Sequence, residues 1–67
     1  MFRYEVGANI LVKRHRRPDD EPIEVKILAK GENLIKAEIL SDGWFAIGAI
    51  RILTGDEWYS IGRTKGE

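Results

Sequence analysis

The chain of 67 residues shows no internal repeat, so it has room for one domain with one hydrophobic core. It contains no cysteine, which excludes a disulfide framework and a thiolate zinc site and favours a reducing, cytoplasmic setting. Eleven basic residues balance eleven acidic ones, so no net charge draws the chain toward polyanions. Its apolar stretches are far shorter than the roughly 20 residues of a membrane-spanning helix, and we expect a soluble protein.

The first predicted strand covers residues 8–13 and is entered through Gly7. The connection that follows, residues 14–22, is highly charged and contains Pro18 and Pro22. Because proline lacks an amide N–H, this segment does not suit a central strand. We therefore expect an exposed loop of about nine residues, longer than the median hairpin connection and of the kind in which binding residues concentrate.

A hairpin is predicted next. Residues 23–30 alternate apolar and charged side chains with the two-residue period of a half-buried strand. The glycine and asparagine of residues 31–33 tolerate positive φ and so favour a turn, after which residues 34–40 resume the alternation. Residues 41–43 contain Asp-Gly, the strongest short hairpin signal between two strand-like runs.

The longest apolar run covers residues 44–53 and is apolar on both faces except at Arg51. It is therefore predicted to be the central, most buried strand. Gly48 in its middle permits a bend, which is how a long strand lets a small sheet curl back on itself.

The end of the chain is predicted to hold one more strand. A turn at residues 53–56 leads into a short last strand over 57–61. Residues 62–67 are polar and are expected to fray. The chain, 1–67, is thus expected to be one small all-β barrel domain with an ordered core over about residues 5–61.

This order of elements resembles that of the SH3-like small barrels, the group that includes Tudor and KOW domains and the C-terminal domains of retroviral integrases. The resemblance covers about residues 5–61 and rests on the element order, the glycine-led opening of residues 4–13 (YEVGANILVK) and the long first loop. It implies a single five-stranded antiparallel barrel. The alternative is an Sm-like barrel, because residues 25–47 can also be laid over the strand-turn-strand core of Sm-like RNA-binding proteins.

A cluster of basic residues begins at the end of the first predicted strand, and residues 1–17 carry five basic residues against one acidic residue. Guanidinium groups match phosphate oxygens in bidentate geometry, so a basic loop is a workable contact to a nucleic-acid backbone. The alternative is a solvated loop that folds back on the three carboxylates of residues 19–21. The candidate binding residues here are Lys13, Arg14, Arg16 and Arg17.

Two adjacent aromatic pairs, Trp44-Phe45 and Trp58-Tyr59, lie in predicted strands, where alternation sends one ring of each pair to each face. We expect Trp44 and Trp58 to be the outward rings, since Phe45 shares a face with Ile47. Outward rings can stack nucleobases, at about 1 to 3 kcal/mol per base, or grip a peptide. The alternative is that these rings close the ends of the barrel.

No constellation of acid, base and nucleophile is evident, and we expect neither enzymatic activity nor a cofactor. His15 is the only histidine, and the arginines beside it disfavour its protonated form and repel a metal cation. Residues 19–21 lack the ligand spacing of an EF-hand loop, so we expect no metal site.

The sequence therefore predicts a non-catalytic binding module. The first hypothesis is nucleic-acid binding, to DNA or RNA, through the basic loop and the outward tryptophans. The alternative is protein–protein interaction, for instance by a small accessory or phage-type protein that modulates a larger enzyme, and the zero net charge favours it. A homo-oligomer formed through unpaired sheet edges is compatible with either hypothesis.

Overall fold

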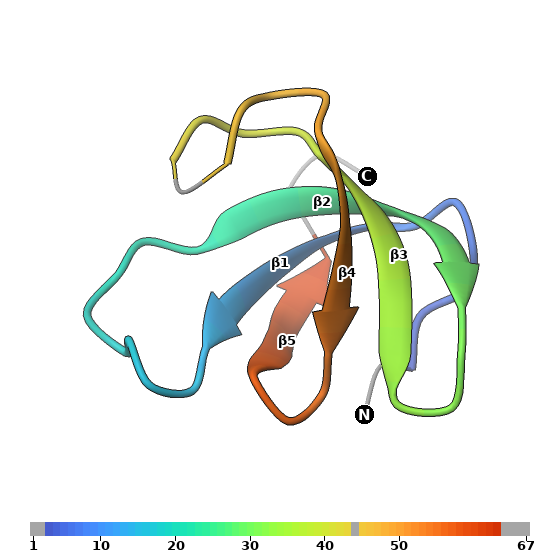
Figure 1. Ribbon diagram of the computed structural model, residues 1–67, viewed down its shortest axis with the longest axis horizontal. Coiled ribbons are helices and arrows are strands. Elements are labelled where there is room, and N and C mark those ends of the chain that lie inside the picture. Colours follow the sequence, from blue (N-terminus) through green and yellow to red (C-terminus); the bar gives the residue numbers. More distant parts are fainter. Residues whose placement is uncertain (1–2, 44, 64–67) are drawn as a thin grey trace.

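The computed structural model describes residues 3–43 and 45–63, and their regular structure is entirely β-strand. The strands pair antiparallel into one sheet in the order β4-β3-β2-β1-β5 (Figure 1). This confirms the predicted fold class, an all-β domain of five antiparallel strands. The described residues form no helix able to cross a membrane. The strands are β1 (Asn9–Arg14), β2 (Ile23–Lys30), β3 (Leu34–Ile39), β4 (Ile50–Thr54) and β5 (Trp58–Arg63).

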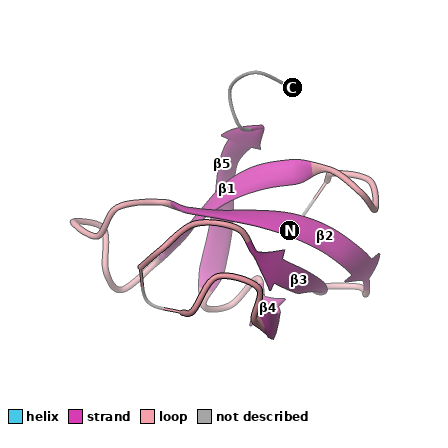
Figure 2. Ribbon diagram, turned by 90° about the horizontal axis from the view of Figure 1, so that it is seen from above, coloured by secondary structure: helices cyan, strands magenta, loops and turns pink. Residues whose placement is uncertain are grey.

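The sheet is strongly curled. Seen from above, β5 and β1 lie on one side of the molecule, β3 and β4 lie on the other, and β2 crosses between them (Figure 2). The central strand is therefore β2, while β4 and β5 are the two edges. The curl encloses a core on the inner face of the sheet.

The core follows from the two-residue alternation of the strands. In β2 the side chains of Ile23, Val25 and Ile27 are buried while the side chain of Lys26 is exposed, as a strand with one solvated face requires. Strands β1 and β3 contribute their inward positions in the same way. The fully buried large side chains are Ile10, Val12, Val25, Ile27, Ile35, Ile39 and Leu53.

The prediction of a central strand over residues 44–53 is wrong. The strand β4 begins only at Ile50 and is an edge of the sheet. Gly48 has a φ of 90°, a left-handed conformation that favours glycine, and its N–H donates to the carbonyl of Ile39 over 2.7 Å. Gly48 therefore lies in the loop that precedes β4 instead of bending a strand. We call residues 40–43 and 45–49 the β3–β4 loop.

The first and last strands, β1 and β5, pair with each other, and the register of this pair shifts between Leu11 and Val12. Leu11 pairs with Gly62, whereas Val12 pairs with Ser60. Strand β5 continues through Arg63, two residues beyond the predicted last strand.

At the end of β5, the Arg63 guanidinium lies 3.0 Å from the Glu5 carboxylate. Hydrogen bonds from its own backbone and from Arg63, together with the Arg63 charge, hold the pKa of Glu5 below its ordinary value of 4.5.

The lowered pKa of Glu5 predicts a pH-dependent contribution to stability. Because the folded-state pKa lies below the unfolded one, the contribution is present above about pH 4.5 and is lost as the pH falls through the folded-state pKa. Glu5→Gln should therefore lower the urea midpoint slightly at neutral pH, and this difference should shrink as the pH falls below about 4.5. Arg63→Gln should give the same pattern, and a loss that persists unchanged at acidic pH would contradict this account.

Candidate interaction surface

The predicted basic cluster begins inside β1 and continues into the loop after it. Lys13 and Arg14 project to opposite sides of the strand, with Lys13 opposite Tyr59 and Arg14 opposite Trp58 in β5. In the loop of residues 15–22, which we call the β1–β2 loop, the Nε of Arg17 lies 3.4 Å from a carboxylate oxygen of Asp20.

Arg16 is exposed and lines a shallow hollow that also contains the acidic residues Asp56 and Glu57. At the start of the same loop the N–H of His15 donates to the carbonyl of Glu57 over 2.9 Å. The four candidate cations therefore do not form one continuous basic face, and two of them have carboxylates in their immediate surroundings.

Trp58 is not an outward ring. Its side chain is only 3% exposed, so the prediction that it faces solvent is wrong. Its ring centroid lies 6.0 Å from that of Phe45, and the guanidinium carbon of Arg14 lies 5.2 Å from the Trp58 ring. The guanidinium carbon of Arg51 lies 4.7 Å from the Phe45 ring in turn. We call these four residues the arginine–aromatic stack.

The stack joins the two ends of the curled sheet. Its members come from β1, β5, the β3–β4 loop and β4. Strands β4 and β5 are the two edges of the sheet and do not pair with each other, so the stack connects strands that hydrogen bonds do not. A guanidinium over an aromatic face contributes about 0.5 to 2 kcal/mol, depending on how far it is desolvated. The stack therefore has a structural role at the side of the sheet that hydrogen bonds leave open.

The outward aromatic side chain at this end is Tyr59, which is half-buried and lies beside His15 with ring centroids 4.9 Å apart. Because Lys13 is opposite Tyr59, one predicted cation shares this small area with two rings. Trp44, the other predicted stacking residue, lies outside the described residues.

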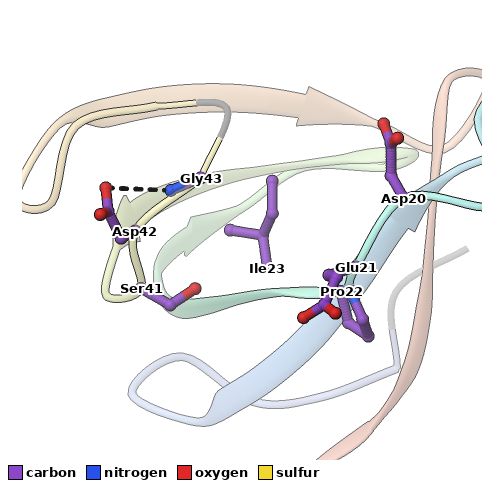
Figure 3. Close-up of a pocket in the computed structure, with 7 residues that line it drawn as sticks. All are labelled: Asp20, Glu21, Pro22, Ile23, Ser41, Asp42 and Gly43. Atoms are coloured by element: carbon purple, nitrogen blue, oxygen red, sulfur yellow. Dashed lines mark hydrogen bonds between the residues drawn. The ribbon is translucent and has the colours of Figure 1, made fainter.

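An open pocket of about 600 Å³ lies between the β1–β2 loop and the β3–β4 loop. Figure 3 shows Ile23 between the two loops, with Asp20 on one side and Asp42 and Gly43 on the other. The β3–β4 loop is fixed here to β2, because the N–H of Glu24 donates to the Ser41 hydroxyl over 2.9 Å. The carboxylates give this pocket a negative potential, but no three metal-ligating side chains converge anywhere in residues 3–43 and 45–63.

The most unusual surface of the molecule lies on and beside β4. Ile47, Ile50 and Ile52 are 63%, 48% and 57% exposed, although isoleucine is among the side chains most often buried. Ile50 and Ile52 share the outer face of β4, while its single charge, Arg51, is turned to the Phe45 ring. We call Ile47, Ile50, Ile52 and the unpaired side of β4 the isoleucine edge.

Backbone groups add to this surface. The Ile39 N–H donates to the Ala49 carbonyl, and the Gly55 N–H donates to the Asn33 carbonyl. These two bonds show which residues of β4 direct their backbone groups toward β3 and which direct them away from it. Since pairs alternate in an antiparallel ladder, Ile50, Ile52 and Thr54 direct their backbone groups away from β3. The Thr54 carbonyl accepts the Glu57 N–H in the following turn. No strand of the described residues pairs with the remaining groups.

Sequence reasoning missed the isoleucine edge, because an apolar run predicts burial and does not reveal whether the burial is in the chain's own core or against a partner. The fold and surface instead define a small all-β domain in which no other described strand covers the outer side of the apolar edge strand β4. Comparisons of the chain with models of protein families, with curated proteins and with solved structures each found no match.

Proposed function

We propose that this chain is a protein-interaction domain of the SH3-like type, which binds a protein strand along the isoleucine edge. The strand order, in which β1 pairs with both β2 and β5, supports the SH3-like type within the class of small antiparallel sheets. The observation that carries the function is the exposure of Ile50 and Ile52 beside outward backbone groups that no strand of residues 3–43 and 45–63 pairs with.

The physical reason is that an edge strand invites pairing unless the sequence protects it. Common protections are charged side chains, above all lysine, and also proline in the strand, a bulge, or a covering segment. The strand β4 contains no lysine or proline, its one charged side chain, Arg51, lies over the Phe45 ring, and its pairing with β3 runs without a register shift. A partner strand that adds to this edge would gain main-chain hydrogen bonds and cover the isoleucines, which is the established mode of β-strand addition.

A second candidate function is nucleic-acid binding, and one observation favours it. Lys13 lies opposite Tyr59, whose ring contacts His15, so a cation and two rings share a small area on one face. Against it, the Arg17–Asp20 contact and the acidic surroundings of Arg16 reduce the local positive potential. Protein binding is the better supported of the two.

The test is site-specific photo-crosslinking in cells that naturally produce the protein. With Ile52→p-benzoylphenylalanine we expect one discrete protein adduct, because this position faces the docked strand. The matched control is the same substitution at Ile61, which is 50% exposed but lies on β5, the opposite edge. The purified partner should bind the Ile50→Lys variant at least about tenfold more weakly than the wild type.

Equal crosslinking from positions 52 and 61, or unchanged affinity of the Ile50→Lys variant, would overturn this proposal. Fluorescence anisotropy with single- and double-stranded DNA and RNA at low salt tests the second candidate. Binding at micromolar protein that Lys13→Glu weakens, and that Ile50→Lys leaves unchanged, would assign the function to nucleic acid instead.

A further inference from the structure

We infer that the partner strand on the isoleucine edge is β4 of a second copy of this chain, paired antiparallel about a two-fold axis through Ile52. This inference rests on the proposed function and names the partner at the same site. The resulting dimer would extend the five-stranded sheet continuously across both copies.

The direction of the backbone N–H and C=O groups of β4 restricts how two copies can pair. Only Ile50, Ile52 and Thr54 direct backbone groups outward, so a two-fold antiparallel pairing must match members of this set with one another. A centre at Ile52 places Ile52 opposite itself and Ile50 opposite Thr54 of the other copy. A centre at Leu53 would instead place Ile50 opposite Asp56, which lies in the turn beyond the end of β4, so that only Ile52 and Thr54 could pair.

A third arrangement, centred on Arg51, is disfavoured by charge. It would place Arg51 directly opposite Arg51 of the other copy, and like charges in that position destabilise a strand pair. The Ile52 centre places Arg51 opposite Leu53 instead. It also gathers Ile50 and Ile52 of both copies into one apolar stripe on the outer face, because diagonal neighbours across paired strands are within reach of large side chains.

The surroundings of β4 suit a second copy. The chain has no net charge, so two copies do not repel each other as a whole. On β3, Lys36 and Glu38 flank Ile52 and Ile50, which mixes both signs beside the edge. The two Lys36 side chains would be three strand spacings apart, about 14 Å. That separation exceeds the screening length of about 8 Å at physiological salt, so their repulsion is small.

The length of β4 also favours an identical partner. The strand has five residues between Gly48 in its loop conformation and the turn at 55–57. A copy of the same strand matches this edge from end to end. Because two short strands bury little surface, we expect a weak dimer whose population depends on concentration.

The test is sedimentation velocity over about a hundredfold range of protein concentration, because dimer population follows mass action. Wild type should shift from monomer to dimer. Ile52→Lys and Ile52→Glu, each alone, should raise the dissociation constant at least about tenfold, because like charges then meet at the two-fold axis. An equimolar mixture of these two variants should associate again, since Lys and Glu would face each other. Ile61→Lys is the control and should dimerise like wild type.

Recovery in the mixture is specific for the Ile52 centre, because in the Arg51 register residue 52 faces residue 50. A wild type that stays monomeric, or a mixture that does not associate, would overturn the dimer. If the wild type is monomeric while position 52 crosslinks to a different protein, the dimer is wrong and the protein-binding edge stands.

Discussion

Replacing Trp58 by alanine is expected to lower the free energy of unfolding by about 3–5 kcal/mol, the usual cost of removing a large buried aromatic side chain. Trp58 is buried in the core and contacts both Phe45 and Arg14, so the substitution removes the centre of the arginine–aromatic stack. Small domains lie near the low end of the range of about 5–15 kcal/mol for total stability. The variant should therefore lose much of its folded population, as urea titration followed by circular dichroism would show.

The matched control is Tyr59→Ala, which removes an aromatic side chain from the adjacent position of the same strand. Tyr59 is half-buried and points outward toward His15, so its loss should cost distinctly less than the loss of Trp58. Equal losses for the two variants would show that the stack does not stabilise the open side of the sheet.

The second large effect is expected at Ile27, in the central strand. Its side chain is fully buried, and Ile27→Ala should cost about 2–5 kcal/mol through lost burial and the cavity left behind. Ile52→Ala removes the same atoms from an exposed position and should change the stability of the monomer by about 0.5 kcal/mol or less. Urea titration at low protein concentration, where the monomer dominates, measures both.

A loss at Ile52 as large as that at Ile27 would mean that the β4 isoleucines stabilise the monomer. The isoleucine edge would then be part of the fold, and the argument for a docked strand would fail.

Much of the fold could be predicted from alternation alone. Residues 23–30 were predicted as a strand and form β2 with those bounds, and residues 34–40 contain β3. Both strands have one solvated and one buried face, so their two-residue period is legible in the sequence. The charged segment after β1 is predicted to be an exposed loop because its two prolines do not suit a central strand, and residues 15–22 form such a loop.

The remainder depends on contacts between distant parts of the chain. Residues 44–53 are apolar throughout, and composition does not distinguish a buried central strand from an edge with an exposed apolar face. The position of Trp58 did have a signal in the sequence. Ile10 and Val12 point inward in β1, so Arg14 lies on the same side of the strand. Trp58, which pairs with Arg14 across β1 and β5, lies on that side as well. Recognising this signal requires the β1–β5 pairing, which no local pattern specifies.

The candidate surface was harder to predict than the fold. The basic cluster is prominent in the sequence, but alternation sends Lys13 and Arg14 to opposite sides of β1, and Asp20 lies beside Arg17. The isoleucine edge has no local motif, because what makes it unusual is the absence of a neighbouring strand. The contact between Arg51 and Phe45 could not be predicted either, because it forms only when the β3–β4 loop folds back over β4.

The pairing of β1 with β5 has a consequence for the order in which the molecule folds. Lys13 meets Tyr59 across most of the described chain, whereas Lys30 meets Ile35 across a short turn. Because the entropy lost in closing a loop increases with its length, the β2–β3–β4 meander should nucleate and the terminal strands should dock afterwards. In a kinetic experiment, substitutions in β5 should then accelerate unfolding with little effect on the refolding rate.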